Sequence, residues 1–137
     1  MFRYVRLEPG SRLPHVSDLE PFKAIVVIER RPTQQWQDEV SRWLVNSGCL
    51  YMMAWGPDCG SWDDSVDYAN MKAFDYGDIP DISDVMTTWH ETDTLAEVFK
   101  FAKEWAQHPA VNLDNLLVCH IGTDDRRADF EELFDTA

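Results

Sequence analysis

Four aspartates recur at every third position of the stretch FDYGDIPDISD, residues 74–84: Asp75, Asp78, Asp81 and Asp84. Gly77 and Pro80 lie between them and disfavour both a regular helix and a central strand. Carboxylates at this spacing can remain in solvent, bind a cation or meet a strongly basic surface. Neighbouring ones lie about 9 Å apart on an extended chain, at roughly 3.1 Å per residue, too far to share one ion without a sharp turn. The stretch also lacks the acid pattern of an EF-hand loop. We therefore predict no metal site.

The wider region is equally one-sided in charge. Residues 56–93 contain ten acidic side chains and one basic side chain, Lys72, and so carry −9 of the formal net charge of −13. Such a field repels nucleic acid and anionic membranes, whereas it attracts a basic protein and accelerates its encounter. Aromatic residues lie among the acids, as in tight protein interfaces. The predicted partner-binding residues are Trp55, Asp58, Trp62, Asp63, Asp64, Asp67, Asp75, Tyr76, Asp78, Asp81, Asp84, Glu91 and Asp93.

The first functional hypothesis is therefore a protein that binds a basic partner, without catalytic residues or a cofactor. The alternative is a small cytosolic hydrolase-type enzyme, because nucleophile, imidazole and carboxylate types follow the predicted strands. Its site would combine Cys59 or Ser61, His90 or His120, and Asp58 or Asp124. It requires a nucleophile and an imidazole within roughly 2.6–3.2 Å. A zinc site would need Cys59, His90 and His120 to converge, and no CxxC or HExxH spacing supports one. A third hypothesis is a small interaction module in a larger complex.

The elements that position these residues alternate between strand and helix. Compact apolar runs predict strands over 22–29, 49–55, 85–90 and 116–121, with a possible edge strand over 2–8. Helical periodicity predicts helices over 33–48, 61–74, 94–108 and 125–135. Strands joined by helices predict parallel crossovers. We expect one α/β domain over residues 1–137, a small three-layer sandwich with a mostly parallel sheet of four to five strands and helices on both faces.

Capping residues predict where the helices begin and end. Thr33 is expected to cap the first helix, and Gly48 to close it. Ser61 with Asp64, and Thr94 with Glu97, predict capping boxes for the next two. Periodicity places Trp62, Val66, Ala69 and Ala73 on the buried face of one helix, and Leu95, Val98, Phe99, Ala102, Trp105 and Ala106 on that of the next.

Three widely spaced cysteines, Cys49, Cys59 and Cys119, fit reduced thiols better than a disulfide framework. The first residues contain no apolar run long enough for a signal peptide. Both features predict a cytoplasmic protein.

The stretches FKAIVVIE, WLVNSGCLYMMAWGPDCGSWDDSVDYANMKAFDYGDIP and VMTTWHE resemble an uncharacterised family of small acidic bacterial proteins, catalogued as a domain of unknown function. The resemblance covers residues 14–121 and implies a bacterial, cytosolic origin. In kind, the chain also resembles the immunity proteins that accompany secreted antibacterial toxins. Many such toxins are basic nucleases, and their inhibitors often place carboxylates where phosphates would bind. This resemblance implies a cognate toxin domain as the partner.

Overall fold

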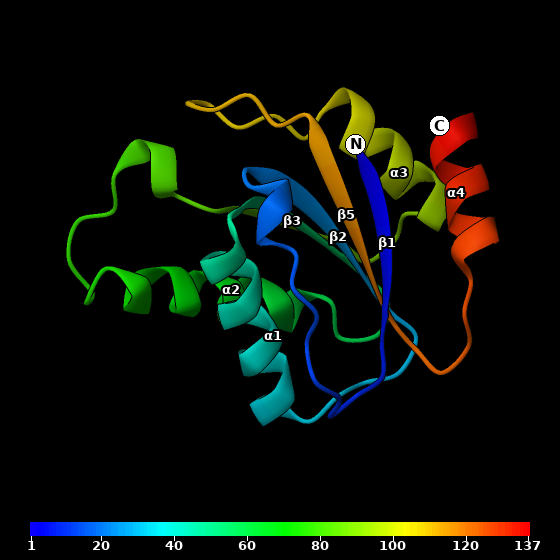
Figure 1. The fold of residues 1–137 in the computed structure, drawn as a ribbon, viewed down its shortest axis with the longest axis horizontal. Helices are drawn as coiled ribbons and strands as arrows, with labels where there is room; N and C mark the ends of the chain where they lie inside the picture. The colour runs from blue at the N-terminus through cyan, green and yellow to red at the C-terminus, as the bar shows by residue number, and fades with distance from the viewer.

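The computed structural model describes residues 1–137 and shows one five-stranded sheet between two layers of helices (Figure 1). The strands are β1 (Phe2–Leu7), β2 (Phe22–Ile28), β3 (Cys49–Trp55), β4 (Met86–His90) and β5 (Asn115–Ile121). They lie in the order β1-β5-β2-β3-β4, and every neighbouring pair is parallel. The predicted α/β class, the parallel sheet and the helices on both faces are confirmed.

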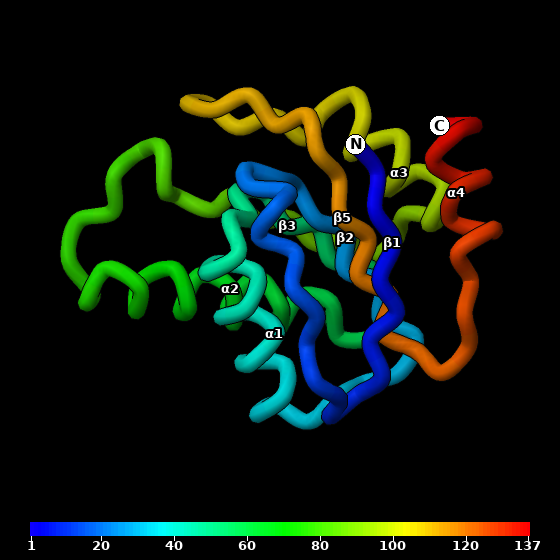
Figure 2. The backbone as a smooth tube through the Cα atoms, in the orientation of Figure 1, coloured from blue at the N-terminus to red at the C-terminus, as the bar shows by residue number.

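Two helices cover each face of the sheet (Figures 1 and 2). On one face lie α1 (Gln34–Ser47) and α2 (Gly60–Ala73), and on the other α3 (Leu95–Glu104) and α4 (Arg127–Thr136). Alternate residues of β2 serve the two cores, because successive side chains of a strand point to opposite faces. Ala24, Val26 and Ile28 belong to the core under α1 and α2, and Ile25 and Val27 to the core under α3 and α4.

Most of the predicted helix signals are confirmed. The Thr33 hydroxyl accepts the N–H of Trp36, Gly48 ends α1 with a left-handed φ of 103°, and Thr94 and Glu97 form the capping box of α3. The capping box of Ser61 and Asp64 is wrong. The chain is already helical at Cys59, so α2 begins at Gly60, and the Ser61 hydroxyl donates to the carbonyl of Asp58 at 2.8 Å.

Ala73, predicted on a buried helix face, is exposed at the end of α2, and so is Trp105, predicted on the buried face of the next helix. Its helix ends at Glu104, and the backbone of Trp105 turns out of the helix with φ −120°. The side chain is therefore 70% exposed, whereas Ala106 and His108 of the predicted final turn are buried.

The sheet order creates one point where the connections diverge. After β2 the chain crosses the α1 face, whereas after β5 it continues into α4 on the opposite face. The carboxyl ends of such a pair of strands form the usual ligand crevice of open parallel sheets. No helix in this structure is both long enough and apolar enough for a membrane crossing.

Candidate functional site

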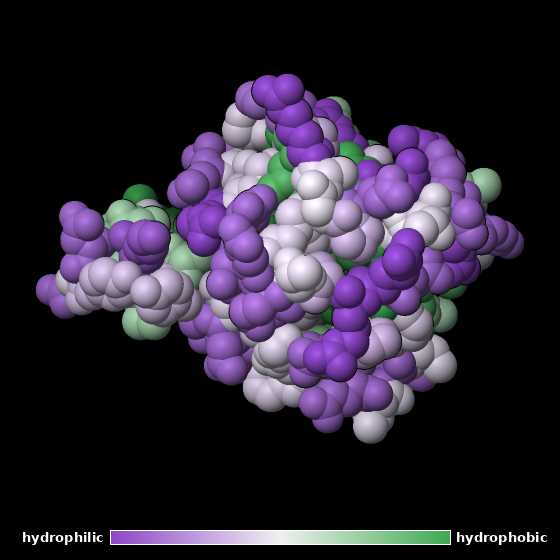
Figure 3. Space-filling view, turned by 90° about the horizontal axis from the view of Figure 1, so that it is seen from below, coloured by the Kyte–Doolittle hydropathy of each residue, from purple (hydrophilic) through white to green (hydrophobic).

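The end of α2 continues into a segment that projects from the body of the molecule. We call residues 74–84 the acidic arm. Figure 2 shows it leaving α2, extending sideways and returning toward β4. Asp75 and Tyr76 adopt left-handed backbone angles, with φ of 51° and 60°, and a short 3-10 turn covers Asp81–Ser83. The arm is the lobe at the left of Figure 3, where hydrophobic atoms lie among hydrophilic ones.

The acidic arm continues an acidic surface on α2. We call Asp63, Asp64 and Asp67 of α2, together with the arm, the acidic strip. Asp58, Glu91 and Asp93 lie beyond the other end of α2, beside the carboxyl ends of β3 and β4. Because α2 has 14 residues, its two ends are about 20 Å apart at a rise of 1.5 Å per residue. The carboxylates of the predicted partner-binding set therefore form an elongated surface along one flank of the molecule.

Most of these carboxylates have no cation of the chain's own. Asp58 pairs with Arg31 at 3.2 Å, and Asp93 contacts Nδ1 of His90 at 2.7 Å. Asp63 accepts a hydrogen bond from the Thr87 hydroxyl. No salt bridge is formed by the remaining members: Asp64, Asp67, Asp75, Asp78, Asp81, Asp84 and Glu91. Their charge is available to another molecule.

Asp67 shows how crowded the strip is. Nearby protein atoms displace water from its carboxylate, and Asp63, Asp64 and Asp84 repel its charge, so that its pKa is raised to about 6. A hydrogen bond with Thr87 acts in the opposite direction. The residue is exposed overall, so water still screens part of this repulsion.

We expect Asp67→Asn to stabilise the protein at pH 8. Between pH 3.8, the ordinary pKa, and about pH 6, the folded chain holds more protons than the unfolded chain. Stability therefore falls as pH rises through this window, and the loss persists above it. Removing the charge should raise the free energy of unfolding by about 1 kcal/mol at pH 8, after allowance for solvent screening. Urea unfolding at pH 8 and pH 3.5 measures this. An equal gain at both pH values would contradict the assignment.

Two buried side chains hold the return of the arm in place. The Asn70 amide donates to the carbonyl of Ser83 at 3.1 Å, and its oxygen accepts the N–H of Val85 at 3.0 Å. Nε2 of His108 donates to the carbonyl of Asp84 at 2.7 Å, while its Nδ1 accepts the N–H of Ala110 at 3.1 Å. These hydrogen bonds therefore fix the end of the arm that returns to the body of the protein.

We expect Asn70→Ala to loosen the end of the arm that returns to the body of the protein. The substitution leaves the buried N–H of Val85 without its acceptor, which should lower the free energy of unfolding by about 1–3 kcal/mol. Amide hydrogen exchange should become faster at residues 83–85. Asn112→Ala is a matched control, since Asn112 is exposed, and should change stability by less than about 0.5 kcal/mol. Unchanged exchange at Val85 in Asn70→Ala would show that the amide does not hold the arm.

The three predicted aromatic residues occupy different environments. Tyr76 is 59% exposed, and its hydroxyl lies 3.0 Å from that of Tyr68. Trp55 is half-buried, and its indole N–H donates to the carbonyl of Asp93 at 2.8 Å. Trp62 lies in the core under α1 and α2 with 1% exposure, so its assignment to the partner-binding surface is wrong. Its helical phase with Val66 and Ala69, which predicted burial, decides its position.

Four exposed apolar residues of this flank were missed in the sequence: Tyr68, Met71, Ile82 and Trp89. Tyr68 and Met71 occupy the side of α2 opposite its buried residues, so the helical period contains the signal for them. Trp89 lies on the edge strand β4 and approaches Gly60 at the start of α2. These side chains place apolar surface beside the carboxylates.

The residues of the hydrolase alternative are not assembled into a site. The Ser61 hydroxyl contacts the Asp58 carbonyl and the Gln37 amide. Cys59 is 2% exposed, and burial raises the pKa of its thiol. Nδ1 of His90 contacts Asp93, and its Nε2 lies 2.9 Å from the Thr88 hydroxyl. Neither imidazole is hydrogen-bonded to Cys59 or Ser61, Asp124 is an exposed loop residue without a side-chain partner, and no cluster of three potential metal ligands is present.

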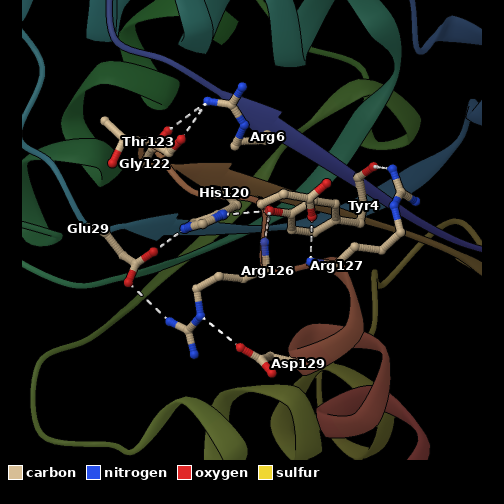
Figure 4. Close-up of polar contacts among 10 residues, drawn as sticks. Tyr4, Arg6, Glu29, His120, Gly122, Thr123, Arg126, Arg127 and Asp129 are labelled. Atoms are coloured by element: carbon tan, nitrogen blue, oxygen red, sulfur yellow. Dashed lines mark hydrogen bonds and ion pairs between the residues drawn. The ribbon is translucent and has the colours of Figure 1, made fainter.

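His120 instead belongs to a chain of hydrogen bonds at the divergence of β2 and β5 (Figure 4). The Tyr4 hydroxyl accepts the N–H of Arg126 at 2.9 Å and lies 2.6 Å from Nδ1 of His120. Nε2 of His120 contacts Glu29, whose other oxygen pairs with Arg126 at 3.0 Å. If the imidazole is neutral, Tyr4 donates to Nδ1 and Nε2 donates to Glu29.

This network joins the start of α4 to the sheet. Burial raises the pKa of Glu29, but hydrogen bonds and charge from His120 and Arg126 outweigh it, so the net pKa lies below the ordinary value. Phe130 of α4 packs against the rings of Tyr4 and His120. Every buried side-chain nitrogen and oxygen in the protein has a partner, so no orphaned group points from the network to a ligand. The sequence patterns did not identify Tyr4 and Arg126 as members of this network, because their contacts join residues more than ninety positions apart in the chain.

The fold and the site together define a parallel three-layer α/β protein with an unneutralised acidic strip along one flank. A family model matches residues 2–137, and the chain belongs to that family, described as a domain of unknown function (DUF7684). The resemblance to an uncharacterised family is thereby confirmed. Comparisons with curated proteins and with solved structures find no significant match.

Proposed function

We propose that this protein is an inhibitor of the immunity type, which binds and occludes a basic toxin domain, specifically a nuclease effector. The observation that supports this proposal is the acidic strip. Eight carboxylates of this flank have no salt bridge within the chain, and the exposed side chains of Tyr68, Tyr76 and Trp89 lie on the same flank. Charge supplies the rate and the choice of partner, and burial of the aromatic side chains supplies affinity.

The mechanism would be exclusion of substrate. A nuclease binds phosphates with lysine and arginine side chains. Carboxylates of the acidic strip would pair with those cations and occupy the place of the phosphates. No cofactor is required.

Repulsion within the strip also favours such a partner. Burial is the largest cause of the raised pKa of Asp67, and repulsion by Asp63, Asp64 and Asp84 in the free protein adds to it. A cation placed among them would lower this pKa and relieve the repulsion. Complex formation near pH 6 should therefore release protons to the buffer, an effect that calorimetry in buffers of different ionisation enthalpy measures.

The decisive experiment combines capture with neutralisation. The wild-type protein is used to capture partners from cells that encode it, in parallel with a variant in which Asp75, Asp78, Asp81 and Asp84 are replaced by lysine. The proposal expects a basic protein on the wild type only. Its isolated expression should arrest growth and degrade nucleic acid, and co-expression of the wild type should restore growth.

Three results would overturn the proposal. The first is that the captured protein does not arrest growth when expressed alone. The second is that co-expression of the wild type does not restore growth, and the third is that the lysine variant protects cells as well as the wild type does. The third result would show that the acidic arm is not the inhibitory surface.

A further inference from the structure

A hollow of about 430 Å³ lies between the acidic arm and the body of the protein. Phe74, Ile82 and Ser83 form its wall on the arm, and Val45 and Leu50 line it from α1 and β3. Eight of its fourteen lining residues are hydrophobic. Its volume falls within the roughly 300–1,000 Å³ that is typical of binding pockets.

The hollow has a defined wall. Asn70, which bonds to Ser83 and Val85, itself lines the hollow, and His108 bonds to the carbonyl of Asp84. The arm is therefore tied to the body beside the opening. Ile82 nevertheless leaves 64% of its surface exposed, so apolar surface is available at the rim.

The charges around the hollow are mostly negative, although Lys72 adjoins the lining residue Ala73 in the chain. The only charged lining residue is Glu20, and no lysine or arginine lines it. Asp75, Asp81 and Asp84 directly adjoin the lining residues Phe74, Ile82, Ser83 and Val85 in the chain. An apolar side chain that enters here would bring its sequence neighbours up to carboxylates. Neighbours carrying lysine or arginine would be attracted, and acidic neighbours would be repelled.

We propose that this hollow receives one apolar anchor side chain of a basic protein partner, with lysine or arginine flanking the anchor in the partner's sequence. The inference rests on the proposed function and adds to it the chemistry of the docking segment. Fully desolvated anchors in pockets typically carry most of the binding energy of an interface. The aspartates of the arm would hold the flanking cations, and the hollow would hold the anchor.

Three synthetic peptides with blocked ends test this inference. Lys-Lys-Trp-Lys-Lys contains both features, Lys-Lys-Gly-Lys-Lys lacks the anchor, and Glu-Glu-Trp-Glu-Glu lacks the cations. We expect the first to bind at least about 10-fold more tightly than either of the others, since one buried aromatic anchor contributes more than about 1.4 kcal/mol. Chemical-shift changes should centre on Val45, Leu50, Phe74, Ile82 and Val85.

Filling the hollow should remove only the contribution of the anchor. Ala73, an exposed lining residue at the end of α2, is replaced by tryptophan, and Asn46→Trp fills the hollow from α1 as a second variant. Each of these two variants should bind Lys-Lys-Trp-Lys-Lys and Lys-Lys-Gly-Lys-Lys with equal affinity. Ala96→Trp, at an exposed position of α3 on the other face, is the matched control and should bind as the wild type does.

The outcomes separate the two proposals. If the filled variants retain the full preference for tryptophan, or if the shifts map elsewhere, the docking site is wrong while the acidic partner surface stands. If Glu-Glu-Trp-Glu-Glu binds as tightly as Lys-Lys-Trp-Lys-Lys, the requirement for a basic partner is wrong, and the proposed function falls with it.

Discussion

Replacing Asp75, Asp78, Asp81 and Asp84 together with lysine is expected to slow association with the basic partner by about 100-fold at low ionic strength. The four aspartates are separate from the ion pairs of the fold, and they lie on a segment that projects from the body. Their charge therefore contributes to the field met by an approaching molecule, and little to folding. Stopped-flow mixing with the captured partner, at a series of salt concentrations, measures the association rate.

A matched control separates local charge from net charge. Glu104, Glu131, Glu132 and Asp135 are exposed residues of α3 and α4, and their replacement by lysine changes the net charge by the same amount. At 0.1 M salt this control should slow association by less than about 10-fold and by less than the arm variant does, because its charges lie on the opposite side of the molecule, beyond a Debye length of about 10 Å. Equal slowing by both variants would mean that the arm has no special role.

The largest expected effect on stability belongs to Trp62. Its side chain is fully enclosed between α2 and the sheet. Trp62→Ala should therefore lower the free energy of unfolding by about 3–5 kcal/mol, through lost burial and the cavity left behind. Urea unfolding followed by circular dichroism measures the loss. Trp62→Phe keeps part of the ring volume and should give an intermediate value if the alanine variant does not fold.

Trp105 provides the comparison with the same chemical change. Because it is 70% exposed, Trp105→Ala should change stability by no more than about 0.5 kcal/mol. The sequence predicted both a buried helical position and a partner-binding role for Trp62, and a buried position for Trp105; the structure buries Trp62 and exposes Trp105. A larger loss in Trp105→Ala than in Trp62→Ala would contradict these positions.

Local patterns were sufficient for most of the fold. The apolar run of β2, the threonine cap at Thr33 and the capping box at Thr94 each depend on neighbours within a few residues, and all were predicted correctly. The prediction of a partner-binding role for Trp62 was wrong because two signals in the sequence disagreed. Its helical period predicted burial, while the acids around it in sequence suggested a surface role. Periodicity reports the direction of a side chain, whereas composition reports only its neighbourhood, so periodicity was the better guide.

The candidate site was only partly accessible from the sequence. The acidic arm is a contiguous segment, so its charge can be counted directly. The hollow beside it combines α1, α2, β3 and the arm with residues near Glu20 and Val111, and no local pattern specifies that meeting. The contact of Tyr4 with His120 likewise follows from the pairing of β1 with β5, which is a property of strand order.

The position of β4 at the border of the sheet has a further consequence. A border strand exposes backbone groups that can pair with a strand from another copy of the same protein, which is a common route to aggregation. Here Asp63 and Asp67 lie beside that border, close to Thr87. Two copies approaching through β4 would bring like charges together. The carboxylates that would recruit a basic protein thus also oppose self-association, and neutralising them in acid would weaken that protection.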